Sequence, residues 1–461
     1  MTATPSLEGL WSPRHRLLTL GLVLAITLVA FEALAVATIM PIVAGDLGSI
    51  QLYGWVFSSF FLGTLLGIVL VGGLIDRGGI VAPFVGGLGL FSLGLLGGGL
   101  APTMEVLIGA RFVQGLGVGA IPPIAYVSIA RALPEGLRPK MFATLSTAWV
   151  LPGIAGPAVS GAVAEALHWR IVFLGLLPLI AIAGAMTIPG LRRLPEPDTA
   201  PPMRHRDRLV PAVLVTAGAA LILAGFSAST LVLAVVLLVA GVILAVPGFG
   251  RLTPPGTLRA ARGLPAAVLL RGVLTFMFFA ADAYVPLALQ DWRGLSASVS
   301  GIALTAATLS WTGGAWLQAR WIGRLGARRF VMAGFVTVGL AVVAFATVLS
   351  PDVPVPVGIV AWALAGLGMG LSYSPLSLII LSEAEPGSQG AASSGLQLSD
   401  VLGTAFGAGI GGAIIAAGHR FGVEAWIGLA GTFTLSVAAA IVGAALSVRL
   451  PDPQAGPTRE G

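Results

Sequence analysis

The chain of 461 residues contains no cysteine and no asparagine, and only 10% of its residues are charged. Without cysteine it can form no disulfide, use no thiol in catalysis and hold no metal through thiolates. Without asparagine it has no N-glycosylation sequon. Soluble domains carry about 25% charged residues, so a chain with so few charges is not expected to be soluble.

Hydrophobic residues make up 56% of the chain and are collected in long runs. Windows of about 20 apolar residues, long enough to cross a hydrocarbon core about 30 Å thick, recur along nearly the whole length. The 64 glycines fit this pattern, because small residues let membrane helices pack closely. The strand alternation of a porin does not occur. The sequence therefore predicts an all-α integral membrane protein.

Fourteen segments are expected to cross the membrane. They are residues 17–43, 53–75, 82–100, 104–129, 143–166, 170–189, 209–227, 229–249, 265–289, 299–319, 330–349, 354–380, 390–417 and 424–448. Of the 25 Lys and Arg, Arg111 lies within a segment, three (Arg170, Arg293 and Arg420) fall on one side, and the other 21 lie at or near the opposite side. Because positive loops stay in the cytoplasm, this bias predicts that both termini are cytoplasmic.

The net charge of +6 raises the question of a nucleic-acid partner. A nucleic-acid site would gather its basic residues on one folded domain, whereas here they are scattered over short loops. In such loops they orient the helices and contact anionic lipids. We therefore expect membrane lipids, and no nucleic acid, as partners.

Three short patterns recur about 250 residues apart. Residues 115–119 (GLGVG) match 366–370 (GLGMG), residues 75–79 (IDRGG) match 322–326 (IGRLG), and Gly153, Gly161 and Arg170 match Gly403, Gly411 and Arg420. Such repeats indicate duplicated six-segment halves. The segments at 209–227 and 229–249 lie outside the repeat.

This repeat predicts seven parts of the chain. They are a cytoplasmic N-terminus (1–16), a six-helix half (17–190), a cytoplasmic linker (191–208), two inserted transmembrane helices (209–250), a second linker (251–263), a second six-helix half (264–448) and a cytoplasmic tail (449–461). Alternating-access transporters place two such halves around a site near the bilayer midplane. Because fold alone does not define function, individual residues have to decide it.

A single carboxylate, Glu32, interrupts the first apolar segment. A charge near the middle of such a segment raises the free energy of membrane insertion by about 2.5 to 3.5 kcal/mol, so a carboxylate at this position is expected to have a structural or functional role. Glu32 is either a structural carboxylate held by hydrogen bonds or an arginine, or a group that binds and releases protons during transport. The protonation of a carboxyl responds to its surroundings, because burial favours the neutral form and a nearby arginine the charged form. We favour the proton role.

Two further acids lie within segments. Asp282 is expected either to couple to protons or to be solvated from the outer side, and Asp400 either to couple to protons or to make a polar contact with a neighbouring helix. Arg271 is expected to extend to the cytoplasmic face. Among uncharged residues, Gln114, Tyr126, Trp149, Tyr284 and Trp311 are candidates to line an apolar cavity, although aromatic residues also serve as packing and interface anchors.

Several motifs in order resemble those of the major facilitator superfamily, specifically its fourteen-span drug:proton antiporter branch. They comprise Glu32 nine residues before Pro41; Gly72, Asp76, Arg77 and Gly79 in a GxxxDRxG loop motif; Leu107, Arg111, Gln114, Gly115 and Gly119; Gly153, Gly156, Pro157 and Gly161 of the antiporter motif; and His168, Trp169, Arg170, Phe173 and Pro178. The resemblance covers almost the entire chain. Ile80 and Val81 depart from it, since they replace the usual basic pair of the loop motif.

The resemblance implies roles for three groups of residues. Arg111 would stand beside Glu32 at a central cavity, either as its switching counter-charge or as half of a static pair. Gly72, Asp76, Arg77 and Gly79 would form a cytoplasmic gate, the alternative being ordinary loop charges. Gly153, Gly156, Pro157 and Gly161 would bend their helix between the halves or serve close packing alone.

We therefore expect a proton-coupled exporter of hydrophobic or amphipathic small molecules, with Glu32, Arg111, Asp282 and Asp400 carrying the charge chemistry. Lipid export is the nearest alternative; a channel, a substrate sensor and a membrane-embedded enzyme are more distant, and no HExxH, GxSxG or paired-carboxylate motif supports catalysis. We expect no catalytic residue, metal site or cofactor beyond the proton gradient, and a monomer in a bacterial inner membrane.

Overall fold

The computed structural model describes residues 10–13, 15–134, 137, 141, 144, 145, 148–194, 206–384 and 389–451, and of residues 72, 73, 76–78, 130, 206–208, 381 and 389–391 it describes the backbone alone. Over these ranges the chain consists of helices and short connections, with no strand. The prediction of an all-α protein is confirmed.

The helices follow one another in three groups. The first comprises α1 (Arg16–Leu47), α2 (Tyr53–Gly78), α3 (Val81–Gly99), α4 (Met104–Val118), α5 (Ile121–Ala132), α7 (Val150–Ala166), α8 (Trp169–Leu174) and α9 (Leu176–Leu191). The second is α10 (Arg206–Phe226) and α11 (Leu231–Leu252). The third comprises α12 (Leu264–Asp282), α13 (Val285–Leu287), α14 (Ala297–Leu325), α15 (Ala327–Ala346), α16 (Val355–Glu383), α17 (Gln389–Arg420) and α18 (Ala425–Leu446).

Twelve helical spans in the described part of the chain are long and apolar enough to cross a membrane, and they coincide with twelve of the fourteen expected segments. The other two expected segments are α7, which has 17 residues, and α14, which has 29. Serine, threonine, glycine and glutamine along α14 make it less apolar than the others. This composition is explained by its surroundings, because α14 packs against α7 and α16 and also contacts α1 and α15.

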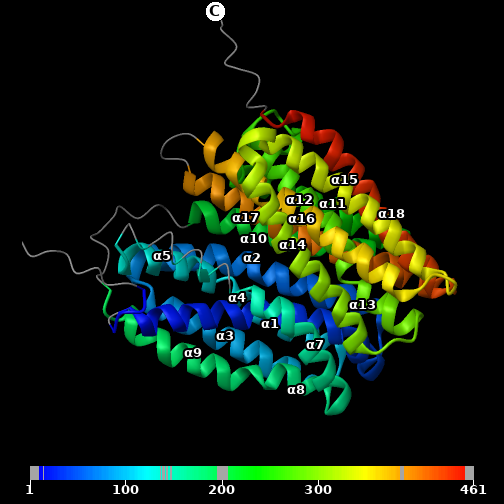
Figure 1. Ribbon diagram of the computed structural model, residues 1–461, viewed down its shortest axis with the longest axis horizontal. Helices are drawn as coiled ribbons and strands as arrows, with labels where there is room; N and C mark the ends of the chain where they lie inside the picture. The colour runs from blue at the N-terminus through cyan, green and yellow to red at the C-terminus, as the bar shows by residue number, and fades with distance from the viewer. Residues whose placement is uncertain are drawn as a thin grey trace, which may run out of the picture.

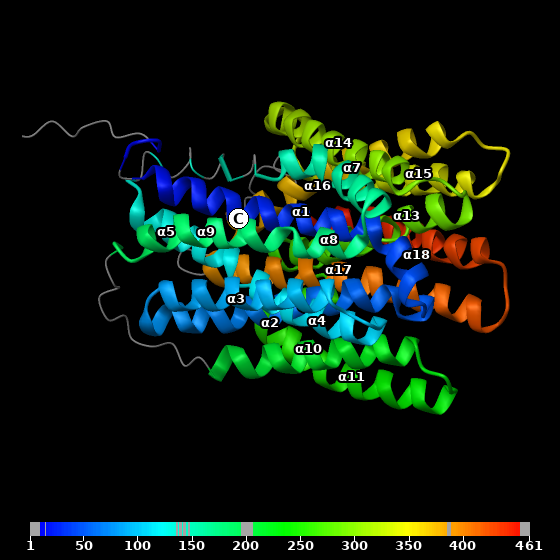
Figure 2. The same ribbon diagram turned by 90° about the horizontal axis from the view of Figure 1, so that it is seen from below.

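The two outer groups form two bundles. Figure 1 shows α1, α3 and α9 in the lower part of the molecule and α12, α15 and α18 in the upper right. The inserted pair α10 and α11 lies at the lower edge of Figure 2, where α10 packs against α2 and α17. It therefore contacts both bundles.

The repeat is visible in the contacts of its glycines. A methyl group at Gly115 on α4 would overlap the carbonyl of Phe60 on α2, and one at Gly366 on α16 would overlap the carbonyl of Ala307 on α14. In the same way, a methyl group at Gly119 would overlap the carbonyl of Thr64, and one at Gly370 would overlap the carbonyl of Trp311. Glycine permits this close backbone approach in both bundles, so α2 with α4 corresponds to α14 with α16.

The third sequence match has no such equivalence. Gly153 and Gly161 on α7 face α14 of the other bundle. On α17, by contrast, Gly403 faces α12, and Gly411 faces Tyr284 and α18 of its own bundle. The spacing matches by sequence, but the two helices present those glycines to different neighbours.

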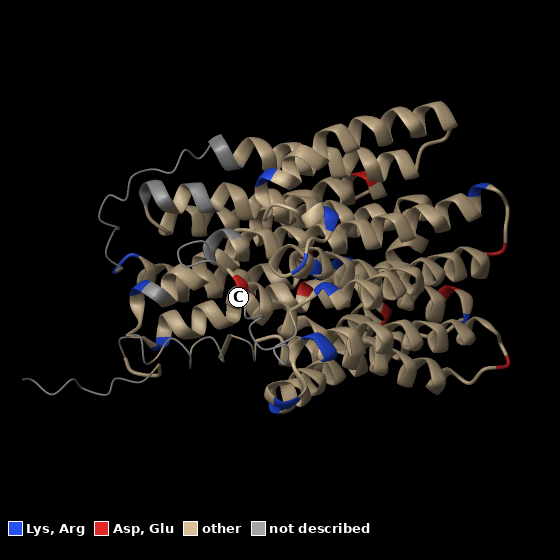
Figure 3. Ribbon diagram, turned by 90° about the horizontal axis from the view of Figure 1, so that it is seen from above, with Lys and Arg blue, Asp and Glu red and all other residues tan. Residues whose placement is uncertain are grey.

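The bundles meet along two seams, α2 against α17 and α7 against α14. One end of the molecule, which we call the basic end, carries Arg16, Arg251, Arg262 and Arg449 at helix ends and in the adjoining linker. Figure 3 shows how sparse charged residues are along the helices. The opposite end is where α1 finishes and α2 begins.

Polar contacts between the bundles gather at the opposite end. The Tyr53 hydroxyl donates to the carbonyl of Ala283 (3.2 Å), the Ser58 hydroxyl to that of Ala405 (2.8 Å) and the Gln290 side-chain amide to that of Thr38 (2.9 Å). The structure therefore records a conformation in which the opposite end is closed.

The glycine contacts generate a prediction about packing. Gly115→Ala would place a methyl carbon 2.9 Å from the backbone nitrogen of Thr64, and overpacking of this kind costs about 1 to 3 kcal/mol. We expect a lower unfolding temperature in detergent. Gly109→Ala on the same helix is the control, because nothing lies within 4 Å of its added methyl group. Equal unfolding temperatures for the two variants would contradict the assigned α2–α4 contact.

Candidate functional site

The first charge cluster joins Glu32 on α1 to Arg111 and Gln114 on α4. Arg111 Nη1 donates to Glu32 Oε1 and, at 2.8 Å, to Gln114 Oε1. Its Nε donates to the carbonyl of Val56 at 3.3 Å, and its guanidinium carbon lies 4.1 Å from the centre of the Phe60 ring. Glu32 is 1% exposed and Arg111 2%. The acid and its suggested counter-charge are thus in direct contact in the core of the first bundle.

Two buried polar atoms in this cluster have no hydrogen-bond partner among the described residues. They are Glu32 Oε2 and Gln114 Nε2. Buried polar atoms are nearly always paired, so this carboxylate oxygen has an unused hydrogen-bonding capacity that a bound proton would use. Gln114, suggested as a cavity-lining residue, is fully buried within the cluster.

The second charge cluster lies in the other bundle and corrects one expectation. Arg271 on α12 does not extend to the surface; it is 2% exposed and its Nε donates to Asp400 Oδ1 on α17 at 2.9 Å. The Tyr373 hydroxyl on α16 donates to Asp400 Oδ2 at 3.0 Å. The expectation was wrong because α16 and α17 cover this turn of α12. They also supply hydrogen-bond partners that offset the desolvation cost of burying a guanidinium.

Arg271 has further partners that do not involve Asp400. Its Nη1 donates to the carbonyl of Tyr373 (2.7 Å) and to the Ser377 hydroxyl (3.2 Å). Its guanidinium carbon lies 3.0 Å from the centre of the Tyr373 ring. Asp400 is the more accessible partner, with 22% of its side chain exposed.

Asp282 lies apart from both clusters. It is buried, and its Oδ1 accepts a hydrogen bond from Trp362 Nε1 at 3.1 Å, so it is not solvated from the outer side in this conformation. A row of aromatic rings leads from Trp362 through Phe278 and Trp311 to Tyr373, with centroid distances of 5.4, 5.6 and 5.2 Å. This row of rings connects Asp282 to the second charge cluster. Trp311, one of the suggested cavity-lining residues, is part of the row.

The remaining suggested lining residues fall into two groups. Tyr126 and Trp149 are each 47% exposed. Tyr284 is fully buried at the closed end, where its hydroxyl donates to the carbonyl of Ala408 and its ring lies 5.4 Å from that of Tyr53. Tyr284 therefore helps to pack the closed end and is shut off from solvent here.

The glycines of α7 face two different neighbours. A Cβ atom at Gly156 would lie 3.6 Å from the Phe31 ring on α1, whereas Gly153 and Gly161 meet α14 of the other bundle. Pro157 packs against Gly301 of α14. Because Phe31 precedes Glu32, α7 is packed between the helix of the first charge cluster and the opposite bundle.

The suggested gate after α2 is described only in part. Gly72 lies within α2, and Gly79 ends that helix with a φ of 87°, a conformation that glycine adopts without strain. Its repeat mate Gly326 has a φ of 81°. The side chains of Asp76 and Arg77 lie outside the described residues, so the gate stays a prediction.

The residues that sequence reasoning missed are mainly aromatic. Tyr373 and Trp362 bind the second-bundle acids, yet neither belongs to a motif. The available signal was that they are the only two aromatic residues in the expected segment 354–380. Asp46 was also missed. Its Oδ2 accepts from Trp169 Nε1 and Arg170 Nη1, both at 2.9 Å, which ties the end of α1 to α8.

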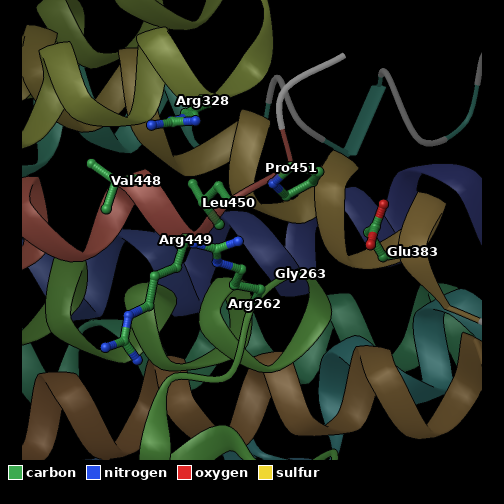
Figure 4. A pocket seen from close by; sticks show the side chains of 8 residues that line it. All are labelled: Arg262, Gly263, Arg328, Glu383, Val448, Arg449, Leu450 and Pro451. Atoms are coloured by element: carbon green, nitrogen blue, oxygen red, sulfur yellow. The ribbon is translucent and has the colours of Figure 1, made fainter. Parts of the chain in front are cut away.

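A separate hollow of about 620 Å³ opens at the basic end (Figure 4). It is lined by Arg262, Gly263, Arg328, Glu383, Val448, Arg449, Leu450 and Pro451. Arg449 Nη1 donates to the carbonyls of Arg259 (2.7 Å) and Ala260 (2.8 Å), and Gly263 N donates to the carbonyl of Arg449 (3.1 Å). These bonds connect the linker before α12 to the end of α18. None of the residues that line the hollow belongs to either buried charge cluster, so the hollow is distinct from both.

Two helical bundles related by an internal repeat, each with a buried ion pair and joined along seams closed at one end, define a multi-pass membrane transporter. The family model described as Major Facilitator Superfamily matches residues 22–394. The chain belongs to this superfamily.

Relatives and a solved structure agree with this family. A probable multidrug-efflux transporter of Mycobacterium tuberculosis is 29% identical over 96% of this chain and 97% of its own length. A cephamycin export protein of Amycolatopsis lactamdurans is 32% identical over 84% of this chain and 83% of its own length. The crystal structure of a POT family transporter matches with a TM-score of 0.69 over 93% of this chain and 97% of that one; at 15% identity this likeness shows the fold alone.

The second charge cluster generates a prediction about Arg271. Removing one partner of a buried ion pair costs about 3 to 5 kcal/mol, because the other charge is left buried and unpaired. We expect Arg271→Gln to lower the unfolding temperature and the yield of folded protein. Arg251→Gln, which changes an exposed arginine at the end of α11, should leave both unchanged. A stable, fully folded Arg271→Gln protein would show that the pair is dispensable for folding.

Proposed function

We propose that this transporter exports hydrophobic or amphipathic small molecules in exchange for protons, by alternating access of its two bundles. The observation that carries this proposal is the Glu32–Arg111 pair, a carboxylate and its counter-charge sealed in the apolar core of the first bundle. The efflux names of the relatives support the direction of transport. Arg111, Asp282 and Asp400 complete the set of charged groups that would take part.

Exchange follows if substrate and proton use the site in turn. While the opposite end is closed, the site would be reached from the basic end, the side that the positive-inside bias predicts to be cytoplasmic together with both termini. Substrate binds there while Glu32 is charged and paired with Arg111. The bundles then rock along the α2–α17 and α7–α14 seams, and a proton taken up from outside neutralises Glu32 and favours release of the substrate.

The seven-part division of the chain belongs to the same proposal. The six-helix halves at 17–190 and 264–448 would be the rocking units, and Gly72, Asp76, Arg77 and Gly79 would latch their cytoplasmic ends. The protein would act as a monomer in a bacterial cell membrane and need no cofactor besides the proton gradient. Membrane lipids and the transported molecule are its other partners.

The inserted helices bear on the choice between drug and lipid export. α10 covers the α2–α17 seam, where Leu223 packs in one apolar cluster with Leu65 of α2 and Leu402 of α17. A lipid moving sideways into the bundle through this seam would have to displace α10. This contact favours small molecules over whole lipids.

The proposal predicts the behaviour of Glu32→Gln in proteoliposomes with an imposed pH gradient. Gradient-driven accumulation of dyes or antibiotics should fall about tenfold or more, the change that corresponds to roughly 1.4 kcal/mol, because the amide cannot exchange a proton. Glu105→Gln, at an exposed acid on α4, is the matched control and should transport normally.

Three results would contradict the proposal. Undiminished gradient-driven accumulation by Glu32→Gln would exclude Glu32 as the essential coupling group. Movement of labelled lipids, without movement of dyes or antibiotics, would replace drug export by lipid export. Flux that ignores the pH gradient in the wild type would instead indicate a channel.

A further inference from the structure

The two buried arginines are held in the same way. Apart from Glu32, Arg111 keeps the carbonyl of Val56, the amide oxygen of Gln114 and the face of Phe60. Apart from Asp400, Arg271 keeps the carbonyl of Tyr373, the Ser377 hydroxyl and the face of Tyr373. Each bundle thus surrounds its arginine with two neutral acceptors and one aromatic ring.

This arrangement distinguishes a switch from a static ion pair. When a carboxylate in an ordinary buried pair is neutralised, the arginine is left without a partner, which is strongly unfavourable. Here the neutral acceptors stay in place and the aromatic face attracts the cation. Each arginine therefore remains bound while its acid changes charge, and each acid is free to exchange a proton.

The acids can also keep partners in both charge states. The charged or titratable groups that contact Asp400 are Arg271 from α12 and Tyr373 from α16. Because a tyrosine hydroxyl accepts as well as donates, a protonated Asp400 retains Tyr373 as its partner. On the other side of α17, toward α2 and α10, the neighbouring Leu398 and Leu402 lie in an apolar cluster. Glu32, contacted by Arg111, has its unpaired Oε2 free to carry a proton.

Neither ion pair links the two bundles. Glu32 and Arg111 are both in the first, and Asp400 and Arg271 are both in the second, so rocking along the seams does not pull either pair apart. The acids differ in access, since 22% of the Asp400 side chain is exposed and only 1% of that of Glu32. In this one conformation Asp400 is the acid that can meet solvent.

We propose that Asp400, Arg271 and Tyr373 form a second proton site, equivalent in construction to the Glu32 site, and that the transporter carries two protons per cycle, one in each bundle. Asp400 binds the proton, Arg271 is its counter-charge, and Tyr373 is a positioning residue that orients both. This inference rests on the proposed function of proton-coupled transport.

Infrared difference spectroscopy of the full chain in lipid, recorded on acidification, tests the site without a substrate. Wild type should show one protonated-carboxyl band from Asp400 and one from Glu32, besides the bands of the buried Asp282 and of exposed acids. Asp400→Asn should lose one, Glu32→Gln the other, and Glu105→Gln neither. Asp400→Glu keeps a carboxyl group on a longer side chain, so its band should remain and shift in frequency. Tyr373→Phe removes only the hydroxyl, so the Asp400 band should remain and shift in frequency.

A spectrum of folded Asp400→Asn identical to that of wild type would overturn the second site. An unshifted band in Tyr373→Phe would remove Tyr373 from it. If Asp400→Asn does not fold, Asp400→Glu and Tyr373→Phe decide, because both retain the ion pair: bands that neither shift nor change in either variant would likewise overturn the inference.

Transport of ethidium into proteoliposomes separates this inference from the proposed function. The number of protons moved per ethidium, measured from the pH gradient that just halts net flux, should be two in wild type and one in Asp400→Asn. A value of one in wild type would overturn the second site and leave proton-coupled export standing. Absence of ethidium transport, with the Asp400 and Glu32 bands both present, would count against the proposed function and leave the second site supported.

Discussion

The architecture depends on how charge is held inside an apolar bundle. An unpaired ion in such surroundings is prohibitively unfavourable, so each buried guanidinium requires a complete shell of partners. Arg111 obtains its shell from α1, α2 and its own helix, and Arg271 obtains its shell from α16 and α17. The helices of each bundle are thereby fixed around a charge as well as by apolar packing. The same shells that stabilise the fold keep the two acids adjacent to a permanent cation.

Close packing of small residues makes these shells reachable. Glycines on α4 let it approach α2 until backbone meets backbone, and this brings Val56 and Phe60 of α2 within reach of Arg111. Equivalent glycines on α16 bring that helix against α14, which places Trp311 against Tyr373 beside Arg271. In a bilayer, where lipid is as apolar as leucine, such contacts between small residues drive helix association. The repeat of the glycines and the pairing of the charges are therefore linked parts of one construction.

The first charge cluster could be anticipated and the second could not, for a physical reason. Glu32 and Arg111 both lie deep in apolar segments, and the family resemblance places those segments side by side. Arg271 lies only a short distance into α12, where sequence position alone allows a long side chain to reach the surface. Its burial depends on which helices cover that turn, and Tyr373 and Asp400 reach it from residues more than 100 positions away. The aromatic row to Asp282 depends on the same long-range packing.

Four properties could be inferred from the amino-acid sequence alone: the chain is helical, it is suited to a membrane, its halves repeat, and it resembles one superfamily. Hydrophobic run length, glycine spacing and local motifs encode these properties, because each depends on residues close together in the chain. The folded structure was needed to show that Arg271 is paired with Asp400, that Tyr284 is packed into the closed end, that the glycines of α7 and α17 face different neighbours, and that α10 covers a seam. Each of these features depends on which surfaces of distant helices pack together. The residue pattern along one helix does not specify which other helix packs against it.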